Sequence, residues 1–310
     1  MGHDWSDPAT HKNDFADVNG VRLNYLDWGG SGPALIFIHG AGQNPHYFDD
    51  LAPAFVDRFR VVAYARRGHG RSEAKEPYDT ATLTEDLRGL MDSLGISRAH
   101  LAGHSMGGNE ITRMAGTHPE RVDRVVYLDA AYDMADPDFG LALNAFPPHL
   151  RAGMPASALT SLEAFRAYAR AMLPAVTDLR RTEAWLREGL EIQPDGSLRI
   201  APTDGVRPAF VAAMSEPRDY TRVHAPALAI FSASFEDLHH GDPGWIAENL
   251  EWNQKYIAPW REKSIERVRR EIENVKILNL PGTHDDLVFT CRAQLVTAME
   301  PFLLGSERSG

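Results

Sequence analysis

One serine in the sequence is flanked by glycines in a way that indicates nucleophilic chemistry. Residues 101–108 read LAGHSMGG, and the five residues centred on Ser105 fit the pattern G-x-S-x-G. A short apolar run, 99–102, precedes this pattern, and a helix-compatible segment reaching His118 follows it. This order predicts a nucleophile elbow, a tight turn between a parallel strand and a helix that exposes one hydroxyl group. Glycines on both sides are expected because the strand and the helix pass too close for a Cβ atom.

The chemistry expected of such a serine is acyl transfer. A serine hydroxyl is a weak nucleophile until an imidazole accepts its proton, and a carboxylate holds that imidazole in the productive tautomer. The backbone N–H of Met106, at the start of the following helix, is expected to face the developing oxyanion. Ser105 is therefore the candidate nucleophile, and an ester, lactone, amide or thioester carbonyl is the expected target.

The composition is typical of a globular enzyme. A length of 310 residues with 43% hydrophobic and 24% charged residues fits one large α/β domain, with or without an insertion. The formal charge of −11 argues against nucleic acid or an anionic membrane as the main partner. The single cysteine, Cys291, excludes an intramolecular disulfide and is expected on the last helix as a small apolar residue.

The sequence shows neither a membrane span nor a targeting segment. No apolar run approaches the roughly 20 residues that a membrane helix needs. Residues 1–15 are polar and acidic and lack the apolar centre of a signal peptide, so a cytoplasmic location is expected.

Strands and helices alternate along the first half of the chain. Asn19-Gly20 predicts a two-residue turn within a hairpin that covers 15–28. A continuous apolar run, typical of a buried parallel strand, occupies 34–38, and further short strands are expected over 60–65, 99–102 and 122–128. Helices are expected between these strands, one carrying Phe48, Leu51, Phe55 and Val56 and another over 82–94. The pattern predicts an α/β fold with a doubly wound, mostly parallel sheet.

The second half begins with a change of pattern. Prolines divide residues 133–222 into short, partly helical pieces, which predicts a helical insertion over the carboxyl edge of the sheet. The sheet is expected to resume at 227–231 and to end with the strand 275–280 and the helix 287–304. Between these strands lie an aromatic stretch, 245–260, which could pack or line a pocket, and a charged helix over 265–272.

Four motifs carry a resemblance to a known family. HGAG, RRGHGRS, GHSMGG and PGTHDDL each follow an expected strand, in the order found in the α/β-hydrolase superfamily. The chain resembles the serine-nucleophile, cap-bearing, esterase-like branch over nearly its whole length. The resemblance implies an eight-stranded sheet with a core formed by 1–132 and 223–310. It also implies a helical cap, 133–222, between strands six and seven.

The resemblance implies a catalytic base and leaves the acid open. His284 is the expected base, since it lies on the loop between the last strand and the last helix. Family members place the acid after strand seven or after strand six. After strand seven the usual acid spacing falls on Phe235, so Glu236 or Asp237 would serve only if the loop carries an extra residue. After strand six stands Asp129, where haloalkane dehalogenases keep their acid, and we favour Asp129.

The remaining site assignments concern the loops around Ser105. The N–H of Ala41 is expected to pair with that of Met106 in an oxyanion hole. Gly40 and His104 are candidates for substrate contact, with packing or loop fixing as the alternative for His104. His39 is expected to brace its own loop.

The other polar clusters are expected to be structural. Arg66, Arg67 and Arg71 could suggest phosphate binding, but RRGHGRS is a structural signature in the family. His100 and His104 straddle a strand rather than converge, and the His239, His240 and Asp242 group is expected in a solvated loop. No metal and no cofactor are expected.

The sequence therefore predicts a serine-dependent carboxylic-ester hydrolase acting on a small-molecule ester or lactone through an acyl-enzyme. A proline-iminopeptidase-like peptidase, a C–C hydrolase and a cofactor-free perhydrolase are alternatives on the same site. A non-catalytic, hydrolase-like binder of small molecules is an alternative of another class. Aspartate in place of Ser105 would have indicated a dehalogenase or an epoxide hydrolase. The oligomeric state is expected to be a monomer or a homodimer.

Overall fold

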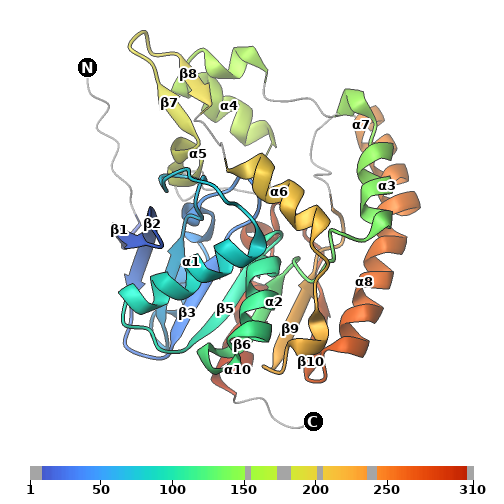
Figure 1. Cartoon of the computed structure of the whole chain (residues 1–310). Coiled ribbons are helices and arrows are strands. Elements are labelled where there is room, and N and C mark those ends of the chain that lie inside the picture. The colour runs from blue at the N-terminus through green and yellow to red at the C-terminus, as the bar shows by residue number, and fades with distance from the viewer. Residues whose placement is uncertain (1–8, 151–154, 173–182, 201–204, 236–242, 306–310) are drawn as a thin grey trace.

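A single eight-stranded sheet forms the centre of the molecule (Figure 1). The computed structural model describes residues 9–150, 155–172, 183–200, 205–235 and 243–305. The strand order is β1-β2-β4-β3-β5-β6-β9-β10. The strands are β1 Lys12–Val18, β2 Val21–Gly29, β3 Ala34–Ile38, β4 Arg60–Tyr64, β5 Ala99–His104, β6 Val122–Leu128, β9 Ala227–Phe231 and β10 Val275–Asn279. Only β2 runs antiparallel to its neighbours, β1 and β4. This confirms the predicted mostly parallel fold.

Both faces of the sheet are covered, because its central strands are apolar on both sides. Successive residues of β3 alternate between two cores: Ile36 and Ile38 join one, and Leu35 and Phe37 the other. The first core packs under α1 (Thr80–Ser93), α2 (Gly107–Thr117) and α8 (Ala258–Glu271). The second packs under α9 (Leu287–Thr290) and α10 (Arg292–Leu304). The carboxyl ends of the strands consequently meet along one protected edge.

Two helix predictions were wrong in detail. The segment with Phe48 and Phe55 forms two short 3₁₀ helices, η1 (Pro45–Phe48) and η2 (Ala52–Phe55), rather than one α-helix. Pro53 has no N–H to donate within a continuous helix, which explains the interruption. The closing helix is also divided, since Cys291 leaves the helical backbone conformation between α9 and α10. The side chain of Cys291 is buried.

The segment between β6 and β9 lies over the carboxyl edge of the sheet (Figure 1). Its described parts contain a two-stranded hairpin as well as helices. They are α3 Pro137–Ala145, η4 Pro148–Leu150, η5 Ala156–Leu159, α4 Leu162–Met172, α5 Glu183–Glu188, β7 Leu190–Ile192, β8 Leu198–Ile200, α6 Val206–Ser215 and η6 Tyr220–Arg222. The N–H of Gly205, just before α6, donates to the carbonyl of Gly68 at 3.3 Å, which ties the segment to the core. The division at 133 and 222 stays a prediction.

The charged helix predicted over 265–272 is longer than expected. α7 (Pro243–Trp252), a π-helical turn η7 (Asn253–Ile257) and α8 follow one another without a loop. Pro259 cannot donate the helical hydrogen bond, and the π-helical turn lies immediately before it. Trp260 stacks between Tyr132 and Phe139, at 4.6 and 4.7 Å between ring centres. Trp260 therefore packs α3 against α8, which supports the packing alternative for this residue of the aromatic stretch.

Short 3₁₀ helix η3 (Pro119–Arg121) completes the described elements and links α2 to β6. Among the described residues, none of the helices combines the length and the apolar character needed to cross a lipid bilayer.

Candidate active site

Ser105 occupies a strained turn between β5 and α2. Its φ is +51°, in the left-handed region that residues other than glycine seldom adopt. The close approach that the sequence predicted is present: a Cβ at Gly103 would lie 2.7 Å from the backbone of Gly107. A Cβ at Gly107 would lie 2.5 Å from the carbonyl oxygen of Ile38 on β3. The turn thus depends on both glycines, and it leaves Ser105 at the end of β5 with 6% of its surface exposed.

The ring of His284 lies beside this serine. His284 Nε2 is 2.9 Å from Ser105 Oγ, although 179 residues separate them in the chain. The loop after β10 that carries His284 is held by its backbone: the His284 N–H donates to Ser234 O at 2.9 Å. Tyr47 donates its hydroxyl to the carbonyl of Asp285 at 3.0 Å, which fixes the next residue of the loop.

Asp129 lies on the other side of the same imidazole. Asp129 Oδ2 is 2.6 Å from His284 Nδ1. Asp129 follows β6 directly, and its φ of +45° places it, like Ser105, in the left-handed region. Of the alternative acids, Glu236 and Asp237 lie outside the described residues. The structure therefore brings Ser105, His284 and Asp129 together in one hydrogen-bonded row.

The Asp129 carboxylate is fully buried, and protein groups donate hydrogen bonds to both of its oxygens. Burial alone would raise its pKa, but hydrogen bonds from His284, Tyr132 and the Ser232 N–H outweigh burial, and the pKa is lowered. Asp129 Oδ1 accepts from the Tyr132 hydroxyl at 2.6 Å and from the Ser232 N–H at 2.7 Å. Neither donor was predicted from the sequence. The one sequence signal for Ser232 was its position, directly after β9.

Phe235, which stands at the usual acid spacing, contacts the base in another way. Its ring stacks on the imidazole of His284 with 4.3 Å between ring centres and 23° between the planes. An apolar ring in this place covers the face of the imidazole while Asp129 binds its edge. Phe235 therefore restricts the orientation of His284 without competing for its nitrogen atoms.

The two amides predicted for an oxyanion hole have no acceptor within the described part of the chain. Neither the Ala41 N–H nor the Met106 N–H donates to another described residue. Their role in an oxyanion hole stays a prediction. Gly40 lies directly against the nucleophile, because a Cβ at this position would be 3.0 Å from the Cβ of Ser105 and 2.9 Å from Gln43 Oε1.

His104 lies behind the serine with its ring fully buried. Its Nε2 donates to the carbonyl of His284 at 2.8 Å, and its Nδ1 lies 3.0 Å from Gln43 Oε1. Gln43 Oε1 also accepts the N–H of Gly40 at 2.8 Å. Burial lowers the pKa of His104 to about 3, so the ring is neutral at pH 7. These contacts support the loop-fixing alternative for His104, and its contact with substrate stays a prediction.

Two of the three arginines of the RRGHGRS turn, Arg66 and Arg67, are engaged in buried ion pairs, whereas Arg71 is exposed. Arg66 Nε lies 2.8 Å from Glu110 Oε1, beneath the elbow, and Arg66 also donates to the carbonyl of His39. Arg67 contacts both carboxylate oxygens of Asp86, at 2.6 and 2.7 Å. Their guanidinium groups are therefore committed to the core, as the structural interpretation of this motif predicted. His39 in turn contacts its own loop, with Nδ1 2.8 Å from the carbonyl of Gly40.

A cavity of about 270 Å³ adjoins the acid. Tyr132, Ser232 and Phe235 line it on the sheet side, and Asn253 and Ile257 line it from η7. Neither Ser105 nor His284 contributes to its wall. The loop that carries Gly40 and Gly42 lies near α6, since a Cβ at Gly42 would be 3.9 Å from Val206.

Comparison with known proteins supports the fold. The family described as "alpha/beta hydrolase fold" matches residues 33–182. Over 193 residues the chain is 31% identical to 2-(acetamidomethylene)succinate hydrolase of Mesorhizobium japonicum, covering 62% of this chain and 61% of that one. Over 119 residues it is 39% identical to fluoroacetate dehalogenase of a Burkholderia species, covering 36% of this chain and 39% of that one. The matches thus span less than two thirds of the length of these relatives.

Solved structures match almost the whole chain. The crystal structure of E-2-(acetamidomethylene)succinate hydrolase superposes with a TM-score of 0.70 at 22% identity, covering 94% of this chain and 99% of that one. The enol-lactonase from Burkholderia xenovorans superposes with a TM-score of 0.60 at 22% identity, covering 94% of this chain and 100% of that one. At this level of identity the similarity establishes the fold.

Proposed function

Because the chain belongs to the α/β-hydrolase superfamily, we propose that it is a serine hydrolase that cleaves a carboxylic ester or lactone through an acyl-enzyme. One observation carries the proposal. The hydroxyl of Ser105 is 2.9 Å from His284, and the other nitrogen of His284 is 2.6 Å from the buried Asp129 carboxylate. These distances allow proton transfer between serine and imidazole without movement of either group.

The first half of the proposed reaction forms the acyl-enzyme. Ser105 Oγ bonds to the carbonyl carbon while its proton passes to His284 Nε2, and Asp129 stabilises the imidazolium. The carbonyl oxygen becomes an oxyanion that accepts hydrogen bonds from the N–H groups of Ala41 and Met106. One donor of this kind is typically worth about 3 kcal/mol in the transition state. The tetrahedral intermediate then collapses, the bond to the leaving oxygen breaks, and His284 returns its proton to that oxygen.

The second half uses the same groups on water. His284 Nε2 accepts a proton from water, whose oxygen attacks the acyl carbon. Collapse of this intermediate breaks the bond to Ser105 Oγ, which recovers its proton from His284. For a lactone, the leaving oxygen stays attached to the acyl group, and the product is a hydroxy acid. The cycle consumes one water and needs no other reactant.

Ser105 also distinguishes this proposal from dehalogenation. Attack of a serine hydroxyl on a halogen-bearing carbon would leave an alkyl ether, which contains no carbonyl for water to attack. A carboxylate nucleophile would instead leave an ester, which water can hydrolyse. We therefore propose acyl chemistry despite the similarity to a fluoroacetate dehalogenase.

Amide cleavage is the second candidate, favoured by similarity to 2-(acetamidomethylene)succinate hydrolase in both sequence and structure. The same row of residues serves if His284 protonates a leaving nitrogen. Relative kcat/KM values for phenyl acetate and acetanilide separate the two candidates. Phenyl acetate is intrinsically more reactive than acetanilide. A ratio of kcat/KM values that favours the ester by more than this intrinsic difference supports ester cleavage, and a ratio that favours the anilide supports amide cleavage.

A fluorophosphonate probe tests the nucleophile directly. We expect one equivalent of label on wild-type protein, none on Ser105→Ala, and slow labelling of His284→Gln. Ser215→Ala is the matched control, because Ser215 is exposed at the end of α6 and its hydroxyl donates to carbonyls of its own helix. Labelling that persists in Ser105→Ala would refute the proposal. Folded wild-type protein that neither labels nor hydrolyses p-nitrophenyl esters would indicate a small-molecule binder.

A further inference from the structure

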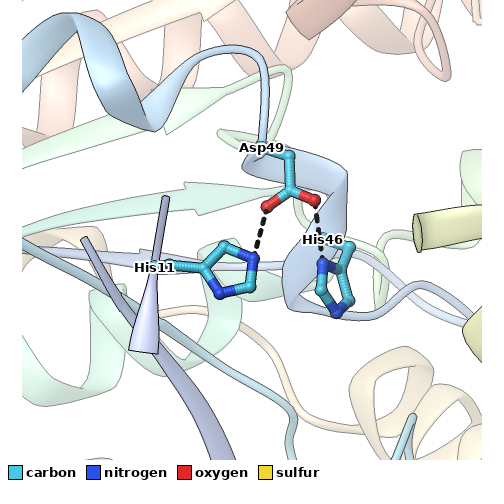
Figure 2. A group of neighbouring side chains, drawn as sticks. All are labelled: His11, His46 and Asp49. Carbon is cyan, nitrogen blue, oxygen red and sulfur yellow. Dashed lines mark hydrogen bonds and ion pairs between the residues drawn. The ribbon is translucent and has the colours of Figure 1, made fainter. Parts of the chain in front are cut away.

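A second group of ionisable side chains lies outside the row of Ser105, His284 and Asp129. His11 Nε2 is 3.4 Å from Asp49 Oδ1, and His46 Nδ1 is 2.8 Å from Asp49 Oδ2. Figure 2 shows the carboxylate of Asp49 between the two rings, with one oxygen turned to each. The three ligand atoms lie within 4.8 Å of one another. The exposed fractions of the side chains are 2%, 6% and 4% for His11, His46 and Asp49.

A fourth group approaches from the segment between β6 and β9. Glu188 Oε2, at the end of α5, is 3.2 Å from the second nitrogen of His46, and its side chain is 5% exposed. The ion pairs of these two buried carboxylates within the described residues are with histidines. With neutral imidazoles the group carries two negative charges, and buried charge of this size requires compensation. Arg71 lies close enough to Glu188 to offset part of this charge, and its backbone N–H donates to Glu188 Oε1 at 3.0 Å, while a divalent cation would offset the rest.

We propose that His11, His46 and Asp49 bind one divalent transition-metal ion, with Zn²⁺ as the best fit to two imidazoles and a carboxylate. Bonds of about 2.0–2.1 Å from zinc to nitrogen and oxygen place tetrahedral ligand atoms roughly 3.3 Å apart. One ligand atom from each of the three residues lies within 4.8 Å of the others, and Asp49 Oδ2 and Oδ1 lie 2.8 and 3.4 Å from His46 and His11, so small side-chain rotations reach this spacing. Three protein ligands leave one coordination position for water.

The position of Glu188 is an independent reason for this assignment. Histidines that bind a metal through one nitrogen usually donate the other N–H to a carboxylate, which fixes the tautomer and the ring orientation. With His46 Nδ1 on the metal, His46 Nε2 would donate to Glu188 in this way. The pair of carboxylates around His46 thus divides into one ligand, Asp49, and one orienting group, Glu188.

The site would join three segments that are distant in the chain. His11 precedes β1, His46 and Asp49 lie on and just after η1, and Glu188 ends α5. The next residue of η1, Tyr47, contacts the loop of His284. Metal binding is therefore expected to hold the amino-terminal segment and α5 against the loop that follows β3.

Zinc uptake by the untagged, full-length chain tests the proposal. After treatment with a chelator and dialysis, titration with ZnCl₂ should give one equivalent per chain by calorimetry and by elemental analysis. Asp49→Asn should weaken binding by more than a hundredfold, and Glu188→Gln by about 10- to 100-fold. His149→Gln is the control, since His149 pairs with Glu248 on the surface. Wild-type protein without uptake, or equal affinity in Asp49→Asn, would overturn the proposal.

A second measurement uses the wild-type protein, with Trp28→Phe only to assign the signal. The ring of Trp28 lies edge-on to His11, 5.2 Å between ring centres. Co²⁺ bound beside His11 should therefore quench Trp28 fluorescence and give a visible absorption band, and Trp28→Phe should remove most of the quenching. One equivalent of Zn²⁺ should also raise the Tm of wild-type protein, because the ion binds only the folded chain. A buried group held together by protons alone would give neither quenching nor a Tm shift, and that result would overturn the proposal.

Discussion

Replacing Asp129 by asparagine isolates the contribution of the carboxylate to the proposed reaction. In the wild type, Asp129 Oδ1 accepts from the Ser232 N–H and the Tyr132 hydroxyl, so the asparagine oxygen should remain at that position. The new NH₂ then faces His284 Nδ1 and Ser232 Oγ. Ser232 Oγ can accept from it, because its own proton can go to the carbonyl of Ser234 at 2.8 Å. The substitution should therefore leave the protein folded.

The consequence for catalysis follows from the tautomer of the imidazole. An NH₂ group opposite Nδ1 forces the proton of His284 onto Nε2, so that Nε2 donates to Ser105 instead of accepting its proton. The equivalent change in another Ser-His-Asp enzyme lowers kcat about 10⁴-fold. At 1.36 kcal/mol per factor of ten, this corresponds to about 5.4 kcal/mol of transition-state stabilisation. We expect a similar loss here, with a decrease in stability of about 1–3 kcal/mol from the lost charge.

Steady-state hydrolysis of p-nitrophenyl acetate and urea denaturation at pH 7 measure the two effects. The matched control is the double variant Glu236→Gln/Asp237→Asn, which should retain kcat. The reasoning fails if folded Asp129→Asn keeps kcat within tenfold of the wild type. It fails completely if the control variant loses activity in its place, since the acid would then follow β9.

Three further predictions concern the surroundings of the site. Gly40→Ala should lower kcat at least tenfold and destabilise the fold by about 1–3 kcal/mol, because the new Cβ meets Ser105 and Gln43. Gly140→Ala on α3, where a Cβ meets no atom within 4 Å, should instead stabilise by up to about 1 kcal/mol; equal melting temperatures for the two would contradict this. Phe235→Ala should lower kcat about two- to twelvefold, since ring stacking is worth about 0.5–1.5 kcal/mol, and Phe235→Tyr should not; identical kcat for both would exclude a positioning role. Burial lowers the pKa of His100 to about 4, so stability is lost as the pH falls from about 6.5. Urea denaturation at several pH values gives the slope of unfolding free energy against pH. His100→Gln should reduce this slope by at most about 1.4 kcal/mol per pH unit in this range. An unchanged slope would refute a lowered pKa for His100.

The strands and their ends were predictable from the sequence because their signals are local. A buried parallel strand is a continuous apolar run, and β3 and β9 occupy the ranges expected, 34–38 and 227–231. The turn at Ser105 was predictable because only glycine fits at the close contacts around it. The order of the motifs along the chain then placed Ser105 and His284 at the same edge.

The acid could not be decided from the sequence, because the choice depends on loop length rather than on residue type. Phe235 holds the usual acid spacing, but only coordinates show that its ring stacks on His284 while Asp129 reaches the edge. Two helices were predicted with the wrong extent for a related reason. Pro53 interrupts one expected helix, whereas Pro259 is accommodated within a longer one by a π-helical turn. Proline marks a local change, and tertiary packing decides which change occurs.

The group around Asp49 had no local signal at all. His11 and His46 are 35 positions apart and Glu188 is far beyond them, so no ligand spacing of the usual kind exists in the sequence. The pairing of η1 with α5 brings them together. The expectation that no metal site exists therefore rested on short-range patterns, and the structure gives reason to revise it.

The left-handed backbone of Ser105 and Asp129 has a consequence for engineering. Positive φ at such residues costs on the order of 1 kcal/mol each, and glycine would adopt the same conformation without this cost. A selection that rewards heat resistance alone should therefore enrich glycine at 105 and discard the hydroxyl with it, whereas at 129 the buried hydrogen bonds of the carboxylate oppose the same change. At position 105 durability and turnover are opposed, so libraries built on this chain need to be screened for both.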